Sequence, residues 1–256
     1  MAHKMILSIS ADAKTSKGEK LGYITGILYL APSTISGYQT CPMAKLAGCE
    51  AACLYSAGRG GFNSVQRARI AKTVRLFEQR TEFMRDLAVS VSRLILAGMY
   101  AGSIPLIRLN GTSDIRFENV PVSIDGLTAK TIRKICGFDI PVGDYSNIMG
   151  VFPEIQFYDY TKIPNRRGLP ANYDLTFSYS GVISFERHTR RAIESGARVA
   201  AVFRRRADIP AEFQGLRTID GDDTDVRHIE PRGVIVALYA KGAARRDVSG
   251  FVVDAV

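Results

Sequence analysis

The run that decides the fold reads Tyr23-Ile24-Thr25-Gly26-Ile27-Leu28-Tyr29-Leu30, and Pro32 stops it. A short apolar run bounded by proline and by a Ser/Gly-rich stretch through Gly37 predicts a strand followed by a loop. The loop continues through three cysteines to the glycine-rich segment 58–61. A strand, a long polar loop and then a helix is the opening unit of an α/β fold.

The rest of the chain repeats this alternation. Helical spacing of apolar residues predicts a long helix from Val65 to Gly98, capped by Asn63 or Ser64 and with a break near Thr81. Strands are predicted at 104–109, 154–158, 173–177, 198–203, 217–219 and 233–238, and helices at 128–135 and 185–195. The expected fold is a full or partial (β/α) barrel with parallel strands, or an open doubly wound sheet.

A single domain is expected, because no linker, repeat or low-complexity tract divides residues 1–256. Within this (β/α) barrel-like domain, residues 31–62 form the predicted cysteine-bearing loop. The beginning of the chain shows no export signal, and no stretch reaches the roughly 20 apolar residues that span a bilayer. We therefore expect a cytoplasmic protein (in the host cytoplasm if it is encoded by a phage) that is not in a membrane.

The composition is ordinary except for its charge. The chain of 256 residues is 46% hydrophobic and carries a formal net charge of +9. A strongly basic protein attracts polyanions, and nucleic acid is the commonest of them. Five cations in and after the glycine-rich segment are the predicted nucleic-acid contacts: Arg59, Arg67, Arg69, Lys72 and Arg75. The alternative is a solvated helix face.

Three cysteines, Cys41, Cys49 and Cys53, lie within one loop. In a reducing compartment, grouped cysteines are more often metal ligands or catalytic groups than disulfides. Thiolates suit zinc or iron–sulfur clusters, and three of them leave a fourth position open for an exchangeable or distant ligand. The alternative is three buried structural thiols. Cys136 is expected to be a helical core cysteine, with the fourth-ligand role as the alternative.

Polar residues follow the predicted strands, where the carboxyl ends of parallel strands form the active-site edge of α/β proteins. The residues expected to converge there are Asn110, Asp114, Asp159, Lys162, Ser178, Ser180, Asp220, Asp222, Asp223 and Lys241. Asp114, Asp159 and Lys162 are the predicted catalytic groups, since paired carboxylates serve as base and nucleophile; helix or turn capping is the alternative for the aspartates. No zinc-protease, Ser-His-Asp, Walker A or dinucleotide motif is present.

Several segments together resemble the "gene product 88" family of bacteriophages and prophages, from about Lys14 to Phe251. They are Thr25-Gly26-Ile27-Leu28-Tyr29-Leu30-Ala31-Pro32, the Cys-Pro and Gly-Cys-x-x-x-Cys-Leu pieces, the segments 108–115 and 157–162, Asp220-Gly221-Asp222 and Ala240-Lys241-Gly242. This resemblance brings no secure activity with it.

A more distant resemblance is to radical S-adenosylmethionine enzymes, which have a partial (β/α) barrel and three cysteines in the loop after the first strand. It implies a [4Fe–4S] cluster on the three cysteines and S-adenosylmethionine as cofactor. The cofactor-binding residues would be Asn110, Gly111, Ser178 and Ser180. The cysteine spacing differs, because these enzymes have x3 and then x2, whereas this chain has x7 and then x3.

The expected function is therefore a phage-type, radical-SAM-like iron–sulfur enzyme that acts on nucleic acid or a nucleotide. Two alternatives stay open. One is a deazaguanine-type nucleic-acid transglycosylase with Zn²⁺, in which Asp114 and Asp159 are acid/base and nucleophile. The other is a non-catalytic, basic nucleic-acid-binding protein with structural zinc.

Overall fold

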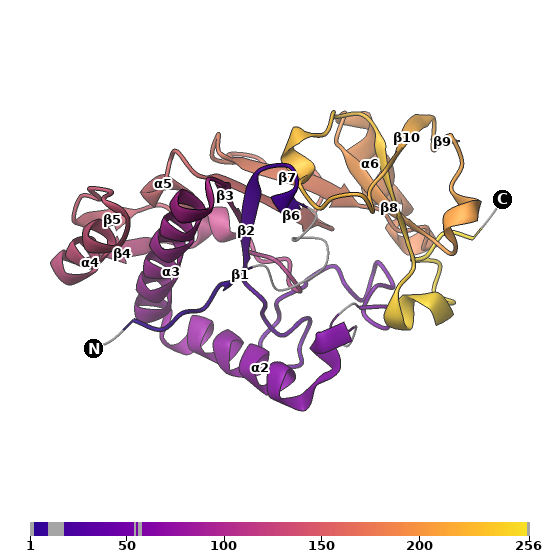
Figure 1. Ribbon diagram of the computed structural model, residues 1–256. Coiled ribbons are helices and arrows are strands. Elements are labelled where there is room, and N and C mark those ends of the chain that lie inside the picture. Colours follow the sequence, from indigo (N-terminus) through magenta and orange to yellow (C-terminus); the bar gives the residue numbers. More distant parts are fainter. Residues whose placement is uncertain (1–2, 10–17, 54, 56–57, 255–256) are drawn as a thin grey trace.

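The computed structural model describes residues 3–9, 18–53, 55 and 58–254, and its centre is one large sheet (Figure 1). The sheet has nine strands in the order β1-β2-β3-β6-β7-β8-β11-β10-β9. Their bounds are β1 Ser8–Ile9, β2 Tyr23–Ile27, β3 Ile104–Arg108, β6 Gln156–Thr161, β7 Tyr173–Ser178, β8 Val199–Phe203, β9 Glu212–Phe213, β10 Leu216–Asp220 and β11 Ile235–Tyr239. A separate antiparallel pair joins β4 Val122–Ile124 to β5 Gly143–Tyr145.

The seven inner strands, from β2 to β10, are all parallel to one another. The two edge strands, β1 and β9, are antiparallel and only two residues long. The predicted parallel α/β sheet is thus confirmed. A closed barrel is not, because within the described residues β1 and β9 are sheet edges and do not pair with each other.

The helices are α2 Asn63–Glu78, α3 Arg80–Ala101, α4 Gly126–Cys136, α5 Ile148–Val151 and α6 Glu186–Glu194. Short 3₁₀ turns are η2 Gly58–Gly61, η3 Phe117–Asn119, η4 Ile183–Phe185, η5 Arg206–Asp208, η6 Arg227–Ile229 and η7 Gly242–Arg246. The predicted long helix is indeed split, at Gln79, two residues before the expected Thr81. No helix in this described part of the chain is long and apolar enough to cross a membrane.

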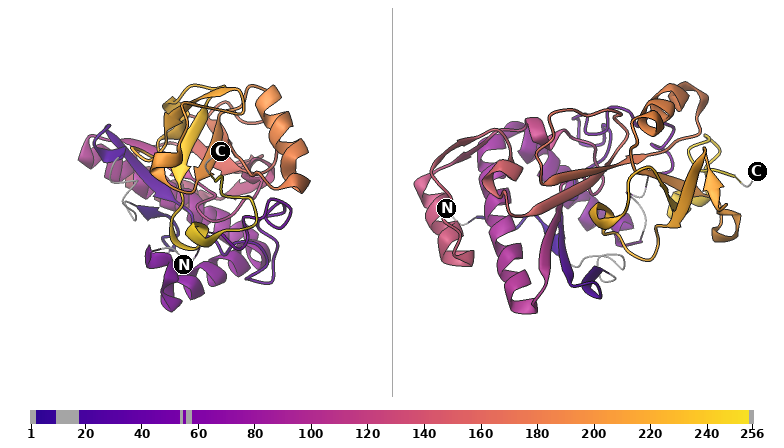
Figure 2. Two further views of the ribbon diagram at one scale, coloured as in Figure 1. Left: turned by 90° about the vertical axis from the view of Figure 1, so that its right-hand side faces the viewer. Right: turned by 90° about the horizontal axis from the view of Figure 1, so that it is seen from above.

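Alternating side chains give the sheet two different faces. Ile107 and Phe157 point to the side covered by α3, whose residues are buried along most of its length. Figure 2 shows this helical layer and, at the other end of the sheet, α6. A second apolar cluster lies between α6 and strands β7, β8 and β11. β7 contributes to both clusters, through Tyr173 and Leu175 to the first and through Phe177 to the second.

The other face carries charged residues that are paired with the connection between β10 and β11. Arg108 of β3 forms an ion pair with Asp225, and the hydroxyl of Tyr160 donates to Asp225 at 3.2 Å. Arg227 is fully buried and pairs with Glu230 at 2.8 Å. Because a buried charge is tolerated only when paired, these contacts fix the connection over the sheet. The face that would line a barrel is therefore filled by this chain itself.

Candidate functional site

The cysteine loop follows β2 and is tied to the ends of neighbouring strands. Thr40 Oγ1 donates to the Ala31 carbonyl at 2.7 Å, and the Asp114 amide donates to the Thr40 carbonyl at 2.8 Å. On the other side, Ser180 Oγ donates to the Ala47 carbonyl at 2.7 Å. The loop is thus anchored to β3 and β7 at their carboxyl ends. Positions 54, 56 and 57 of the predicted loop lie outside the described residues.

The three thiols are partly buried, and the charge of Cys53 acts on both Cys41 and Cys49. Burial, helped by the negative charges of Asp114 and Cys53, raises the pKa of Cys41 to about 11. Hydrogen bonds with Ser33 and Thr40 oppose this shift. Burial also raises the pKa of Cys49, and the charge of Cys53 acts in the same direction. Within the part of the chain that the structure describes, no three His, Cys, Asp or Glu side chains surround one point as a single metal ion requires.

The fourth cysteine is elsewhere. Cys136 ends α4 and is buried in the apolar cluster under α3, where its thiol donates to the Ile132 carbonyl at 3.5 Å. The expectation of a core cysteine agrees with this position, and the fourth-ligand alternative has no geometric support.

Asp159 is fully buried at the end of β6 and holds the turn that follows β3. Its carboxylate accepts hydrogen bonds from the amides of Leu109 and Asn110, at 3.2 and 2.9 Å, and from the Tyr173 hydroxyl at 2.9 Å. Burial raises its pKa to about 6. Asn110 continues the arrangement, because its side-chain oxygen accepts from the Ser113 hydroxyl and the Ile115 amide. Asp159 and Asn110 thus meet as predicted, in a supporting network.

Asp114 connects this turn to Lys162. It is buried and accepts from the Thr161 hydroxyl and the Lys162 amide, both at 2.8 Å, and Arg166 Nη1 lies 3.6 Å away. Burial raises its pKa, against the effect of these partners. Both carboxylate oxygens of Asp114 therefore accept hydrogen bonds within the protein. This geometry is that of a residue that positions its neighbours.

Lys162 places an ammonium group beside the cysteine loop. Its Nζ donates to the carbonyls of Ser178 and Tyr179, at 3.0 and 2.6 Å, and lies 4.4 Å from the centre of the Phe251 ring. Burial lowers its pKa to about 8, although Cys49 and Asp114 oppose that shift. A lysine with such a pKa exchanges its proton close to neutral pH, as catalytic lysines do.

The remaining predicted cofactor residues lie at the same edge. Gly111 donates its amide to the Leu28 carbonyl at 3.1 Å, so the turn packs directly on the end of β2. Ser178 supplies a carbonyl to Lys162, and Ser180 anchors the cysteine loop. In contrast, Lys241 follows β11 and its ion-pair partner Asp222 follows β10, at the far end of the sheet. The predicted convergence of polar side chains is therefore seen only after strands β2 to β7.

The basic residues of α2 do not form the expected continuous surface. Arg59 and Arg67 are exposed, but Arg69 is buried, with its guanidinium 4.8 Å from the Tyr29 ring and bonded to the Tyr55 carbonyl. Two others are also used internally: Lys72 donates to the Ile6 carbonyl at 3.3 Å, and Arg75 pairs with Asp86 at 2.6 Å. Three of the five predicted contacts are thus bonded within the protein.

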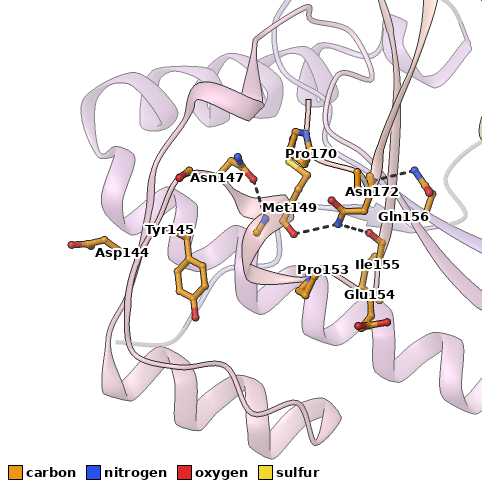
Figure 3. Close-up of a pocket in the computed structure, with 13 residues that line it drawn as sticks. Asp144, Tyr145, Asn147, Met149, Pro153, Glu154, Ile155, Gln156, Pro170 and Asn172 are labelled. Carbon is orange, nitrogen blue, oxygen red and sulfur yellow. Dashed lines mark hydrogen bonds between the residues drawn. The ribbon is translucent and has the colours of Figure 1, made fainter. Parts of the chain in front are cut away.

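Two hollows flank the sheet at opposite edges. A groove of about 780 Å³ lies at the amino ends of β6 and β7, where the Asn172 amide bonds to the carbonyls of Met149, Phe152 and Ile155 (Figure 3). These contacts complete the end of α5, and no predicted site residue lines the groove. A cavity of about 520 Å³ lies beside the cysteine loop, between Ala51 and residues 242–249.

The model of the family described as "Gene product 88" matches residues 5–255. The chain belongs to this family. It is a phage-type family of unknown activity. Membership therefore confirms the resemblance to this family and assigns no reaction to the chain. No curated protein and no solved structure matches the chain. The resemblance to radical S-adenosylmethionine enzymes therefore has no support from these comparisons.

In this member of the family, two contributors to the site gave no sequence signal. Arg166 lies between Asp114 and Glu118, bonding Glu118 through Nε at 2.9 Å, and Phe251 covers Lys162. Thr161 was detectable, because strand alternation places it on the same face as Asp159.

Proposed function

We propose that the protein is an iron–sulfur enzyme of the radical-SAM type, with Cys41, Cys49 and Cys53 as cluster ligands, that acts on nucleic acid or a nucleotide. One observation carries the proposal. The loop with three neighbouring thiols and the Asn110–Asp114 turn follow adjacent parallel strands and meet at one sheet edge, beside the buried Lys162. In parallel α/β proteins this edge is where ligands bind.

The strand order supports a partial barrel as the finer description of the fold. Strands β2, β3, β6, β7 and β8 follow one another in space in the order in which they occur in the chain. A doubly wound sheet reverses its direction near the middle, and its ligand site lies at that reversal. Here the first departure from chain order is at β11 and β10, well away from the thiols. A sheet that winds in one direction is typical of (β/α) barrels.

The charges around the thiols suit an anionic centre. Although burial raises the pKa of both thiols, Arg69 lowers that of Cys53 and Lys162 lowers that of Cys49. Cluster-bound cysteines are thiolates, and buried negative charge is stable only with positive charge nearby. The protein therefore supplies the countercharge that such a ligand set needs.

The preference for a cluster over one zinc ion rests on the place of the cysteine loop, directly after the first long strand of the parallel sheet. Zinc holds each thiolate about 2.3 Å from a single centre, whereas in a cluster each thiolate bonds a different iron. Cys41, Cys49 and Cys53 would be the ligands of that cluster.

When bound, a [4Fe–4S] cluster with three cysteine ligands leaves one iron open for the methionyl group of S-adenosylmethionine and supplies an electron to that cofactor. The chain's own residues have other tasks. The Asn110–Asp114 turn, held by Asp159, would contact the cofactor's amino group, as the resemblance to radical S-adenosylmethionine enzymes implies. Lys162, oriented by two carbonyls, is the group that can hold or release a proton at Nζ. Phe251 shields that ammonium from water.

Anaerobic purification followed by iron and sulfide analysis tests the proposal. We expect about four iron and four sulfide per chain. Cys49→Ala should lose them, and Cys136→Ala, which removes a thiol from the core, should keep them. Far-UV circular dichroism checks that both variants fold. A wild-type protein without iron, or iron retained in Cys49→Ala, would overturn the assignment.

Stoichiometric zinc in the same analysis would point instead to the transglycosylase or to the zinc-containing binding protein. The transglycosylase needs free carboxylate oxygens on Asp114 and Asp159. Both groups accept hydrogen bonds from the protein itself at each oxygen. The geometry therefore does not favour it.

A further inference from the structure

Three segments that are distant in sequence meet at the outer side of the cysteine loop. Ser184 Oγ donates to the Leu46 carbonyl at 3.2 Å, and Ser249 Oγ donates to the Gly48 carbonyl at 3.1 Å. The Gly181 amide donates to the Gly250 carbonyl at 3.0 Å. The cavity of about 520 Å³ lies at two of these segments, between Ala51 and residues 242–249. We call this surface, with the exposed face of α6, the rim.

The rim exposes apolar side chains that the core does not use. Ile183 is 88% exposed, Val248 is 98% exposed and Leu46 is 37% exposed. Single exposed aliphatic residues are common on proteins. Here three come from separate segments and lie next to a candidate site, so a ligand with apolar faces would cover them.

The rim also carries unpaired positive charge. Arg187, Arg190 and Arg191 are exposed and share one side of α6, because residues three and four apart are neighbours on a helix. Arg246 lines the cavity. Within the described ranges, none of these four arginines forms a side-chain hydrogen bond or ion pair, and Glu186 and Glu194 on α6 pair with none of them. Arginines further along the chain do pair, as Arg204 does with Asp254 at 2.7 Å.

Unpaired arginines next to exposed aliphatic side chains match the chemistry of nucleic acid. Arginine neutralises backbone phosphates, and aliphatic side chains insert between bases. A cavity beside the insertion point can accept an unstacked base. The net charge of +9 favours a polyanion over an acidic protein patch, because it attracts along the whole strand.

We propose that the rim is the nucleic-acid-binding surface, with the backbone along Arg187, Arg190, Arg191 and Arg246 and the bases against Ile183 and Val248. This inference rests on the proposed action on nucleic acid and names where that substrate docks. It replaces the surface of α2, whose cations Arg69, Lys72 and Arg75 are bonded inside the protein. Figure 1 shows α6 and α4 at opposite ends of the molecule, which offers a matched control.

Fluorescence anisotropy with labelled single-stranded DNA and RNA of about 20 nucleotides tests the rim. In R187Q/R246Q we expect at least tenfold weaker binding, and a salt dependence between about 50 and 200 mM whose slope falls by about 1.4, or 0.7 per lost phosphate contact. The control R133Q/K134Q removes the same charge from the exposed side of α4 and should bind like the wild type.

A second variant separates apolar contact from charge. I183S/V248S should weaken binding by roughly tenfold and leave the salt slope unchanged, because it removes apolar burial and no ionic contact. All four substituted rim positions are exposed, so unchanged circular dichroism is expected. Equal weakening by R133Q/K134Q, or no binding by the wild type, would overturn the rim.

The two proposals fail separately. Binding is measured on the protein as purified, whether or not it contains iron, and iron is measured without nucleic acid. Rim-dependent binding by an iron-free protein would retain the rim and reject the enzyme. Iron without binding would do the reverse.

Discussion

Arg69 and Lys72 lie one helical turn apart on α2, and both turn inward. Arg69 is only 7% exposed. Among the described residues, its guanidinium contacts the rings of Tyr29 and Tyr55 and the Tyr55 carbonyl rather than a carboxylate. Burial and, to a smaller extent, the charge of Arg69 lower the pKa of Lys72 to about 8. Burying a cation without an acid beside it costs stability. The charge of Arg69 in turn lowers the pKa of the Cys53 thiol, against the effect of burial.

The substitution Lys72→Met tests the buried charge of Lys72 through the pH dependence of the unfolding free energy. The folded pKa of Lys72, about 8, lies below its unfolded value of 10.5, so between these values the unfolded chain holds the extra proton. The contribution of Lys72 to stability therefore rises with pH from about 8 to 10.5 and is lost as pH falls through 8. Urea unfolding in reductant should show the wild type gaining on Lys72→Met across that window. Parallel curves would contradict the prediction.

Asp159→Asn should destabilise the protein by about 1–3 kcal/mol, because the new NH₂ group faces N–H and O–H donors that lose their acceptor. The affected donors are the amides of Leu109 and Asn110 and the Tyr173 hydroxyl. Urea unfolding measures the loss. Asp139→Asn is the control, since Asp139 is exposed and should change stability by less than about 0.5 kcal/mol.

At the scale of elements, the turn after β3 is fitted tightly to the end of β2. A Cβ on Gly111 would lie 2.6 Å from Cγ2 of Ile27 and 2.7 Å from the Tyr29 ring. We expect Gly111→Ala to cost about 1–3 kcal/mol in unfolding free energy, as overpacking does. Gly126→Ala, at the start of α4 with nothing within 4 Å, should be neutral or stabilising by about 0.4–1 kcal/mol. Equal effects of the two would reject this account.

The elements that the sequence predicted are those with enough residues to show a period. The strands at β2, β3, β6, β7, β8, β10 and β11, the split helix and the helices α4 and α6 are confirmed within a few residues. The edge strands β1 and β9 and the antiparallel pair β4–β5 were missed, because two or three residues carry no alternation. The sequence also did not predict that β10 lies outside β11, since a pattern along the chain does not give the order of strands across a sheet.

The candidate site was predictable where it depends on strand ends alone. Parallel strands end at one edge, so Asn110, Asp159 and Lys162 could be placed together. The pairing of Asp114 with Lys162, and the inward direction of Arg69, could not be predicted, because a buried arginine and an exposed one look the same in a polar helix. Those contacts depend on tertiary packing.

At the scale of the whole molecule, β7 joins two apolar clusters. Tyr173 and Leu175 pack with the α3 side, and Phe177 packs with the α6 side. Because one continuous sheet passes through both, we expect a single unfolding transition. Far-UV circular dichroism and tyrosine fluorescence should give the same urea midpoint, and the chain has 11 tyrosines and no tryptophan to report on it. Two separated midpoints would show that the halves unfold independently.

The bond between Ser249 and Gly48 has a consequence for biosynthesis. Ser249 is 201 residues downstream, and a ribosome adding 5–20 residues per second reaches it about 10 to 40 seconds after Gly48. During that time the loop with Cys41, Cys49 and Cys53 has been synthesised, but the segment around Ser249 that packs on its outer side has not. The cluster proposed here would therefore meet an open loop until the segment around Ser249 has been translated.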